Sequence, residues 1–273
     1  MPKDIQPDLV AIKKAEAQGI KFSPDKKILL ESTKKHIKQL VIPEGVTKIN
    51  AHVFSFSKLE RVVFPSTLTT IGPKAFFASS KLTEIDIPNT ANIGERAFCS
   101  CLKLKKASLK GVKKLGYSVF EYCDELEKVE IVLHEKLKII TDETLKGNTI
   151  TDITIPKSLK TLGDCAFEFV TSLTNVVIPD GVTSIERCAF SKCSNLTNVV
   201  IPDSVTYIGY EAFLGCEKLT NIIIPDSVTC IIEDAFRGAA CEEEVKQKYA
   251  HLFRKPTLRE KWGDKLARTI AGN

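Results

Sequence analysis

The chain has 273 residues, of which 43% are hydrophobic and 27% charged, and its formal net charge is +5 at pH 7. This composition is typical of a globular domain with a buried core, and no stretch reaches the roughly 18 apolar residues of a membrane-spanning helix. Acidic residues interleave with lysine and arginine throughout, so the small positive charge does not favour nucleic-acid binding.

Residues 1–36 predict an N-terminal cap. The segment from about Asp8 to Gln18 favours a short helix over the open end of the first repeat, with Gly19 as its stop. The N-terminal sequence has no apolar core of a secretory signal. We therefore expect the chain as written to be cytoplasmic, and a surface or secreted location applies if it is a fragment of a longer chain.

Residues 37–238 repeat one unit of about 23 residues nine times. Each copy opens with an aliphatic residue, two more follow at plus three and plus five, and proline usually closes the pattern. Alternating β-branched residues favour a strand, and proline ends a strand because it has no N–H for the next ladder bond. Each copy therefore predicts one short strand. Clear examples are Leu173, Val176, Ile178, Pro179; Leu196, Val199, Ile201, Pro202; and Leu219, Ile222, Ile224, Pro225.

Two copies in the middle of the chain depart from this pattern. The copies that open at Leu104 and Leu126 lack the proline, and the second of them has an insertion around Val132 to Glu135. That second copy also has Leu145 at the position where the other copies have phenylalanine. The repeat is therefore least regular at this point.

Each copy continues after the proline with a second apolar pair three residues apart, such as Val205 and Ile208, and then with a phenylalanine. An alanine usually precedes the ring, which lets a neighbouring backbone approach. Because no single copy can bury its apolar face alone, the copies must stack, and the rings then form a column inside the coil. This phenylalanine spine comprises Phe54, Phe76, Phe98, Phe120, Phe167, Phe190, Phe213 and Phe236.

Residues 239–273 predict a C-terminal amphipathic cap and tail. In "CEEEVKQKYAHLF" the residues Val245, Tyr249, Leu252 and Phe253 share one helical face, and three glutamates stand at the favourable helix start. Such a helix covers the core face of the last coil.

A second amphipathic run follows Pro256. Leu258, Trp262, Leu266 and Ile270 recur at intervals of four, among basic residues. Further capping or a loose tail, docking into a partner groove, and contact with a membrane surface all remain open for this run.

The motif "IPDSVTYIGYEAFLGC" and its siblings resemble the leucine-rich repeats of the BspA-like surface-antigen class. The resemblance covers about three quarters of the chain. It implies a leucine-rich repeat solenoid, a strand-rich and curved right-handed coil of the α/β repeat class, which recognises proteins and carries no catalysis. The segment Gly19 to Leu30 also resembles the hairpin that often accompanies such arrays, with Ser23 to Lys26 as its turn.

The nine cysteines follow the repeat more than any metal motif. Cys101, Cys123, Cys193 and Cys216 each lie three residues after the spine position, which predicts buried structural thiols. A second column, two residues before the ring, holds Cys165 and Cys188. Since the chain has no C-x-x-C pair and no histidine at ligand spacing, we expect no metal site and no cofactor. An odd number of cysteines without a secretory signal favours a reducing compartment.

Outward-facing strand positions indicate where a partner would bind, because alternate side chains point away from the core. In the last three regular copies these positions form an apolar stripe, and asparagines form a ladder beside it. Two explanations stay open: a contact surface for a protein, or β-branched residues that merely favour exposed strand positions. The candidate binding residues are Val177, Val200, Ile223, Asn175, Asn198 and Asn221.

Catalytic patterns are missing from the sequence, which has no glycine-rich phosphate loop, nucleophile elbow or paired histidine and carboxylate. The best interpretation is a non-catalytic scaffold that binds a protein partner through its exposed strand face, without nucleic acid or membrane insertion. The alternative is an adhesion-type surface domain cut from a longer protein. A regulatory domain of an enzyme encoded elsewhere is a third possibility.

Overall fold

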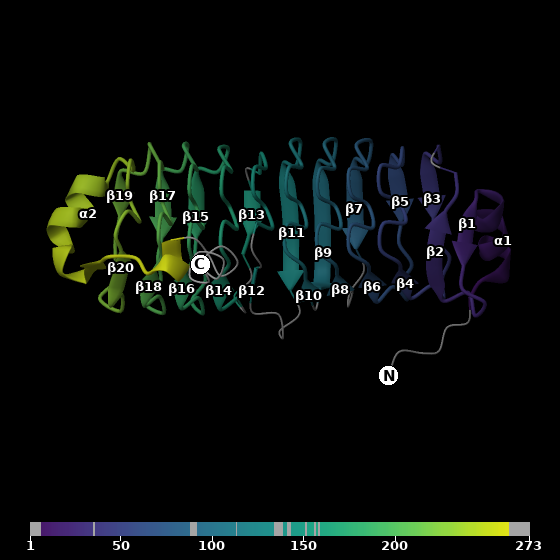
Figure 1. Ribbon diagram of the computed structural model, residues 1–273, viewed down its shortest axis with the longest axis horizontal. Helices are drawn as coiled ribbons and strands as arrows, with labels where there is room; N and C mark the ends of the chain where they lie inside the picture. Colours follow the sequence, from purple (N-terminus) through teal and green to yellow (C-terminus); the bar gives the residue numbers. More distant parts are fainter. Residues whose placement is uncertain are drawn as a thin grey trace, which may run out of the picture. The chain divides into compact units, whose positions relative to one another are not determined.

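A computed structural model describes residues 7–34, 36–87, 92–112, 114–133, 139–140, 143–150, 152–155, 157 and 159–261. The chain divides into two compact units (Figure 1). Unit 1 is 1–137 with 152–154, and unit 2 is 138–151 with 155–273. This division falls inside the repeat region, and the domain boundaries at residues 36 and 238 stay predictions.

Unit 1 consists of an N-terminal helix and two six-stranded sheets. The first sheet has the order β1-β2-β4-β6-β8-β10, and the second has the order β13-β11-β9-β7-β5-β3. Strands of the first sheet are β1 (Ile20–Phe22), β2 (Ile28–Ser32), β4 (Lys48–Ile49), β6 (Thr70–Ile71), β8 (Asn92–Ile93) and β10 (Lys114–Leu115). Strands of the second are β3 (Gln39–Val41), β5 (Arg61–Val63), β7 (Glu84–Ile87), β9 (Lys106–Val112), β11 (Lys128–Leu133) and β13 (Asp152–Thr154).

Unit 2 repeats the same arrangement with a six-stranded and a three-stranded sheet. Its six-stranded sheet has the order β12-β14-β16-β18-β20-β21, and the other sheet has the order β15-β17-β19. Strands of the larger sheet are β12 (Ile139–Ile140), β14 (Thr161–Leu162), β16 (Ser184–Ile185), β18 (Tyr207–Ile208), β20 (Cys230–Ile232) and β21 (Phe253–Arg254). Strands of the smaller are β15 (Asn175–Val177), β17 (Asn198–Val200) and β19 (Asn221–Ile222). Each unit is thus a stack of parallel coils, which confirms the predicted leucine-rich repeat solenoid.

The lengths of the strands confirm that proline ends them. Where proline follows, as after β5 and β15, the strand has three residues. In the two copies without proline the ladder continues, and β9 and β11 reach seven and six residues. Their pairing runs from Lys106 opposite Lys128 to Val112 opposite Leu133. Without the proline, each of these two strands is therefore about twice as long as a strand that proline ends.

The prediction of one strand per copy was incomplete. The second apolar pair of a copy also enters a sheet, because its last residue and the residue before it form a two-residue strand such as β16 or β18. These strands pair in parallel, with Ile185 opposite Ile208. A strand this short shows too little alternation to be recognised from the sequence. Each regular coil therefore has two strands, and each strand points a buried side chain into a common core.

The phenylalanine spine is confirmed within each unit. Neighbouring rings stack with centroid distances of 5.0 to 5.8 Å from Phe54 to Phe120, and of 5.1 to 5.5 Å from Phe167 to Phe236. All eight rings are buried, as is Leu145. The buried residue before each ring accepts a hydrogen bond from the ring residue of the preceding coil, as in Phe213 N–H to Ala235 at 2.7 Å. Small residues at this position thus let the backbones meet.

Two left-handed residues bracket each ring, at two positions before and two positions after it. Cys165 and Phe169 have φ of 55° and 61° around Phe167, and Cys188 and Lys192 have φ of 54° and 59° around Phe190. Most L-residues avoid this region, and hydrogen bonds between stacked coils stabilise these residues there, as in Cys165 N–H to Arg187 at 2.8 Å. The bends fix the direction of the side chains on either side of the spine.

The N-terminal cap agrees with its prediction. Helix α1 (Leu9–Ala17) begins after Asp8, whose carboxylate accepts from Val10 N at 3.0 Å and from Ala11 N at 3.1 Å. Gly19 follows the helix with φ of 88°. Strands β1 and β2 form the antiparallel hairpin, with Lys26 N–H donating to Ser23 at 2.9 Å in its turn. Strand β2 then pairs with β4 and so begins the sheet.

The C-terminal cap departs from its prediction. Helix α2 (Glu242–Lys248) forms and buries Val245, but it ends before Tyr249. A 3₁₀ turn, η1 (Ala250–Leu252), follows, and Phe253 starts strand β21 instead of continuing the helix. Strand β21 pairs with β20 at the end of the sheet. The exposed edge of β20 offers backbone hydrogen bonds that the helical pattern could not reveal. Trp262, Leu266 and Ile270 lie outside the described residues.

Candidate functional site

The predicted apolar stripe lies exposed on the three-stranded sheet of unit 2. Val177 is 66% exposed and Val200 is 47% exposed, and these residues are direct partners in the parallel pairing of β15 and β17. Ile223 follows the last residue of β19 and is 76% exposed. The residues between them and the asparagines, Val176 and Val199, are buried, so the expected alternation holds.

The asparagine ladder runs beside the stripe at the start of the same strands. Asn175 pairs with Asn198, and Asn198 pairs with Asn221, in the parallel register. All three are exposed. Asn175 donates from Nδ2 to Thr174 Oγ1 at 3.0 Å. The structure therefore brings together all six residues that the sequence nominated, and nothing among the described residues covers them.

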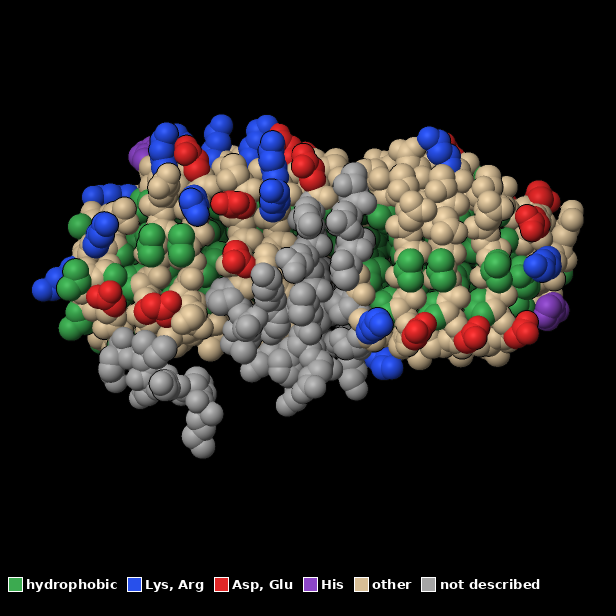
Figure 2. All heavy atoms as spheres, turned by 180° about the vertical axis from the view of Figure 1, so that it is seen from behind, with side chains coloured by type: hydrophobic (Ala, Val, Ile, Leu, Met, Phe, Trp, Pro, Cys, Tyr) green, Lys and Arg blue, Asp and Glu red, His purple; other side chains and the backbone are tan. Residues whose placement is uncertain are grey.

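A row of aspartates borders the stripe on the opposite side from the asparagines. Asp180, Asp203 and Asp226 each come three residues after a stripe residue, and all are exposed. Figure 2 shows acidic side chains along one side of a row of apolar side chains on this face of unit 2. The aspartates were not among the predicted binding residues, although the repeated "IPD" is a visible signal in the sequence. Together the three rows form what we call the stripe surface.

The corresponding face of unit 1 has a different character. Val41 and Val63 are exposed at the stripe position, but the next two strands place Asp86 and Ser108 there. A depression of about 610 Å³ over β5, β7 and β9 is lined by both acidic and basic side chains. Its charged lining consists of Arg61, Glu84, Asp86 and Lys106. This face therefore lacks the apolar continuity of the stripe surface.

The first cysteine column is structural, as predicted. Cys101 and Cys123 are buried in unit 1, and Cys193 and Cys216 are buried in unit 2. Each thiol donates to the carbonyl oxygen of a spine phenylalanine, for example Cys193 Sγ to Phe167 at 3.1 Å. Burial raises the pKa of Cys216 to about 12, so this thiol stays protonated at neutral pH. These thiols satisfy carbonyl oxygens in the core.

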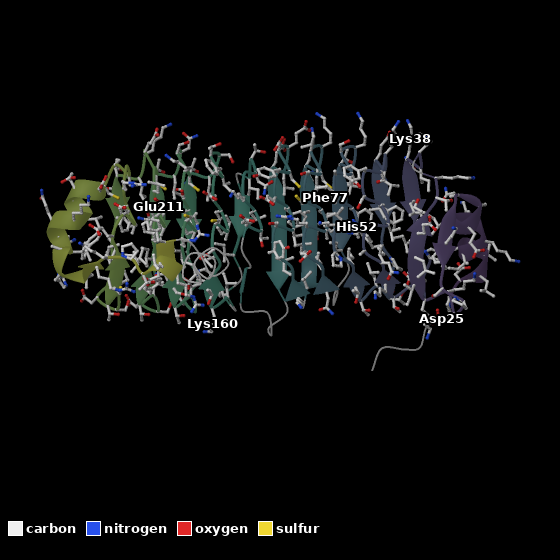
Figure 3. The ribbon with its side chains drawn as sticks, in the orientation of Figure 1. Asp25, Lys38, His52, Phe77, Lys160 and Glu211 are labelled. Carbon is white, nitrogen blue, oxygen red and sulfur yellow. The ribbon has the colours of Figure 1, made fainter. Side chains whose placement is uncertain are left out.

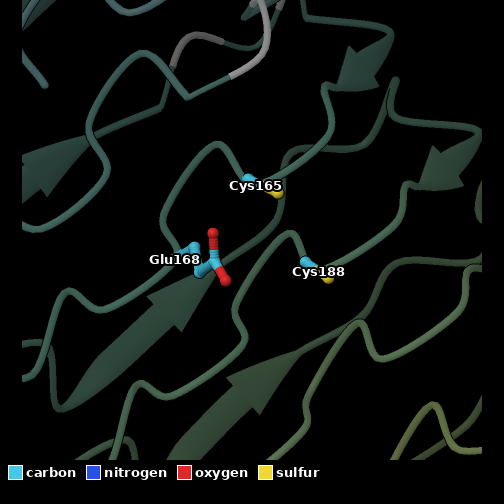
Figure 4. Close-up of side chains that lie close together, drawn as sticks. All are labelled: Cys165, Glu168 and Cys188. Atoms are coloured by element: carbon cyan, nitrogen blue, oxygen red, sulfur yellow. The ribbon is translucent and has the colours of Figure 1, made fainter. Parts of the chain in front are cut away.

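The second cysteine column forms a cluster that the sequence did not reveal. Cys165 and Cys188 are each 4% exposed, and Glu168 approaches them (Figure 4). Their two Sγ atoms and one carboxylate oxygen all lie within 4.8 Å of one another. Stacking brings the two cysteines together although they stand 23 residues apart. Their shared repeat position was the only signal, since no local motif contains both.

Two cations neighbour this cluster. Lys146 Nζ lies 2.8 Å from Glu168 Oε2, and Arg187 Nη1 lies 3.7 Å from Cys188 Sγ. Burial alone would lower the pKa of Lys146, but its hydrogen bond and ion pair with Glu168 raise that pKa above the usual value. A further carboxylate, Glu211, has Oε2 3.7 Å from Cys188 Sγ (Figure 3). The cluster thus combines two thiols, two carboxylates and two cations.

None of the described histidines belongs to the cluster of Cys165, Glu168 and Cys188. His36, His52 and His251 are exposed, and His134 lies outside the described residues. No helix within the described ranges combines the length and apolar character needed to span a bilayer.

Comparison with known proteins relates this geometry to one repeat family. The model of the BspA type leucine rich repeat region, with six copies, matches residues 32–144 and 138–246. A solved leucine rich repeat protein of T. pallidum is 22% identical, with a TM-score of 0.53, over 89% of this chain and 96% of that one. A leucine rich cell surface protein of Faecalibacterium prausnitzii is 20% identical, with a TM-score of 0.46, over 90% and 96%. No curated protein matches the chain in sequence.

Proposed function

Because the chain belongs to the BspA-type leucine-rich repeat family, we propose that it is a non-catalytic scaffold that binds a protein partner through the stripe surface of unit 2. The observation that carries the proposal is the apolar row of Val177, Val200 and Ile223 between two polar rows. Leucine-rich repeat solenoids are generally non-enzymatic, which agrees with the missing catalytic groups.

The magnitudes show why the polar rows matter. Burying the exposed parts of the three stripe side chains contributes roughly 1 to 2 kcal/mol each, or about 3 to 6 kcal/mol together. Before the cost of association, that range corresponds to dissociation constants from about 6 mM to about 40 μM, and the cost of association weakens them further. The asparagine ladder and the aspartate row must therefore contribute direct hydrogen bonds and charge complementarity.

The chemistry of the three rows defines the partner. Its contact segment carries an apolar row that covers the stripe, basic side chains opposite Asp180, Asp203 and Asp226, and backbone or amide groups opposite the asparagines. Basic residues on the partner fit because none of the three aspartates has an ion pair among the described residues. Association is then faster at low ionic strength.

A pair of matched substitutions tests the proposal. The partner is first identified by affinity purification with mass spectrometry and then purified, and its affinity is measured by calorimetry. Val200→Glu places a charge in the stripe and abolishes binding, whereas Val41→Glu makes the same change at the equivalent exposed position of unit 1 and leaves binding intact. Both variants keep the melting temperature, because both side chains are exposed. Equal binding by Val200→Glu and the unaltered chain would remove this site.

The compartment belongs to the same proposal. No disulfide joins any of the nine cysteines, and eight of them are buried, which supports a reducing compartment. We therefore propose that the scaffold works in the cytoplasm. Cell fractionation combined with protease treatment of intact cells measures this, and digestion from outside would favour the adhesion-type alternative.

A further inference from the structure

We propose that Cys165, Cys188 and Glu168 form a binding site for a thiophilic divalent cation, with Zn²⁺ as the fitting ion. The three side chains come from two neighbouring coils of unit 2. Each cysteine stands two residues before a spine phenylalanine, and Glu168 directly follows Phe167. This inference is independent of the stripe surface and of the proposed binding of a partner.

The spacing of the ligand atoms suits a small tetrahedral ion. With Zn–S distances of about 2.3 Å, two thiolate sulfurs at a tetrahedral zinc are about 3.8 Å apart. The two Sγ atoms and the Glu168 oxygen lie within 4.8 Å of one another, so adjustments of about 1 Å or less complete the geometry. Among the described residues, no other three histidine, cysteine or acidic side chains are grouped in this way.

The donor set selects the class of metal. Thiolates prefer Zn²⁺ and other soft or borderline ions, whereas Ca²⁺ and Mg²⁺ require oxygen ligands. Three protein ligands leave one tetrahedral position, which water fills or Glu211 reaches from the next coil, since its Oε2 lies 3.7 Å from Cys188 Sγ.

Two cations lie beside the charge that the metal centre would carry. One Zn²⁺ with two thiolates and one carboxylate has a net charge of −1, and Lys146 and Arg187 lie close enough to offset it. Arg187 is itself held by Asp164, with Nε 3.1 Å from Oδ2. Such outer partners orient the ligands and contribute about 10- to 100-fold to metal affinity.

Metal binding must displace protons from both thiols. The charged groups that face the cluster are Lys146, Glu143, Arg187, Asp164 and Glu211. Because thiolates are the ligands, metal binding releases protons and the affinity rises with pH.

The experiment uses the full chain, reduced and freed of metal, and titrates it with Co²⁺ and then with Zn²⁺. We expect one Co²⁺ per chain, with a thiolate-to-cobalt absorption band that Zn²⁺ abolishes. Cys165→Ser and Cys188→Ser each lose the band, and Glu168→Gln weakens binding by about 10-fold or more. Cys193→Ser is the matched control, because Cys193 and Cys216 also lie one coil apart and are buried, but their thiols donate to backbone carbonyls.

A second measurement keeps the proposal testable if a variant misfolds. In the unaltered chain, Zn²⁺ should slow alkylation of Cys165 and Cys188 by N-ethylmaleimide, as peptide mass spectrometry detects, and leave the alkylation of Cys230 unchanged. No absorption band and no protection would overturn the metal site. An equal loss of the band in Cys193→Ser would also overturn it. The same holds if Cys165 and Cys188 are found joined by a disulfide and the chain takes up no metal after that disulfide is reduced.

Discussion

Deleting one ring from the middle of the phenylalanine spine tests the architecture most directly. Phe213 is fully buried, and its ring centroid lies 5.5 Å from that of Phe190 and 5.1 Å from that of Phe236. Loss of a large ring from a packed core costs about 3 to 5 kcal/mol. Within that loss each stacked pair accounts for about 0.5 to 1.5 kcal/mol, and Phe213 loses two pairs, so its loss lies near the upper end of the range. We therefore expect Phe213→Ala to lower the free energy of unfolding by about 4 to 5 kcal/mol.

Three further variants show whether stacking is the cause. Phe236→Ala loses only its pair with Phe213 and should cost about 1 kcal/mol less. Phe213→Leu keeps an apolar side chain but loses both stacked pairs, so it should cost about 1 to 3 kcal/mol, which is less than the alanine change. Leu145 already fills the same position in another coil. Phe56→Ala is the exposed control, because this ring is 64% exposed. Urea titration followed by circular dichroism gives each free energy. Similar losses for Phe213→Ala and Phe56→Ala would refute the spine.

Two other perturbations examine the C-terminal cap and the strand-ending proline. Arg254 holds Glu260 by hydrogen bonds of 2.5 and 3.0 Å and lowers the pKa of that carboxyl to about 2. The carboxylate thus contributes stability that is full above pH 4.5 and is lost as the pH falls towards 2. Glu260→Gln should therefore lower the free energy of unfolding by about 1 kcal/mol at pH 7. The variant should also lose less stability than the unaltered chain between pH 4.5 and 2, and an equal loss in both would contradict the pairing. Lys110→Pro introduces the proline into the first of the two copies that lack it, so it should end β9 early. Amide hydrogen exchange at residues 111–112 and 132–133 should then become faster. Slow exchange at these residues would show that proline does not set the length of the strand.

Much of the architecture follows from residues that recur with the repeat. The spine was predictable because a large apolar ring at one position in every copy has no stable place except the interior. The exposure of Val177 and Val200 followed from strand alternation. The end of each strand at proline was predictable because proline has no N–H for the next ladder bond. The two copies without proline have longer strands in the structure, which agrees with that prediction.

Features that depend on neighbouring coils escaped prediction. The helical pattern predicted Phe253 on the apolar face of the C-terminal helix. In the structure the backbone of Phe253 instead pairs with Ile231 at the edge of β20. Cys165 and Cys188 meet only because equivalent positions of adjacent coils are stacked, with both residues held at positive φ. A motif search within one copy cannot find a ligand set that one copy does not contain.

The hydrogen bonds that join each ring residue to the next coil have an evolutionary consequence. Within either unit, each coil presents the same backbone donors to the coil that follows it, and the following coil presents the same acceptors in return. Phe190 N–H donates to Ala212, and Phe213 N–H donates to Ala235. Duplication or deletion of a whole repeat in the gene therefore regenerates a matching junction, while a change of any other length interrupts the register. Arrays of this kind grow and shrink by complete units, and their reach can change without a new core.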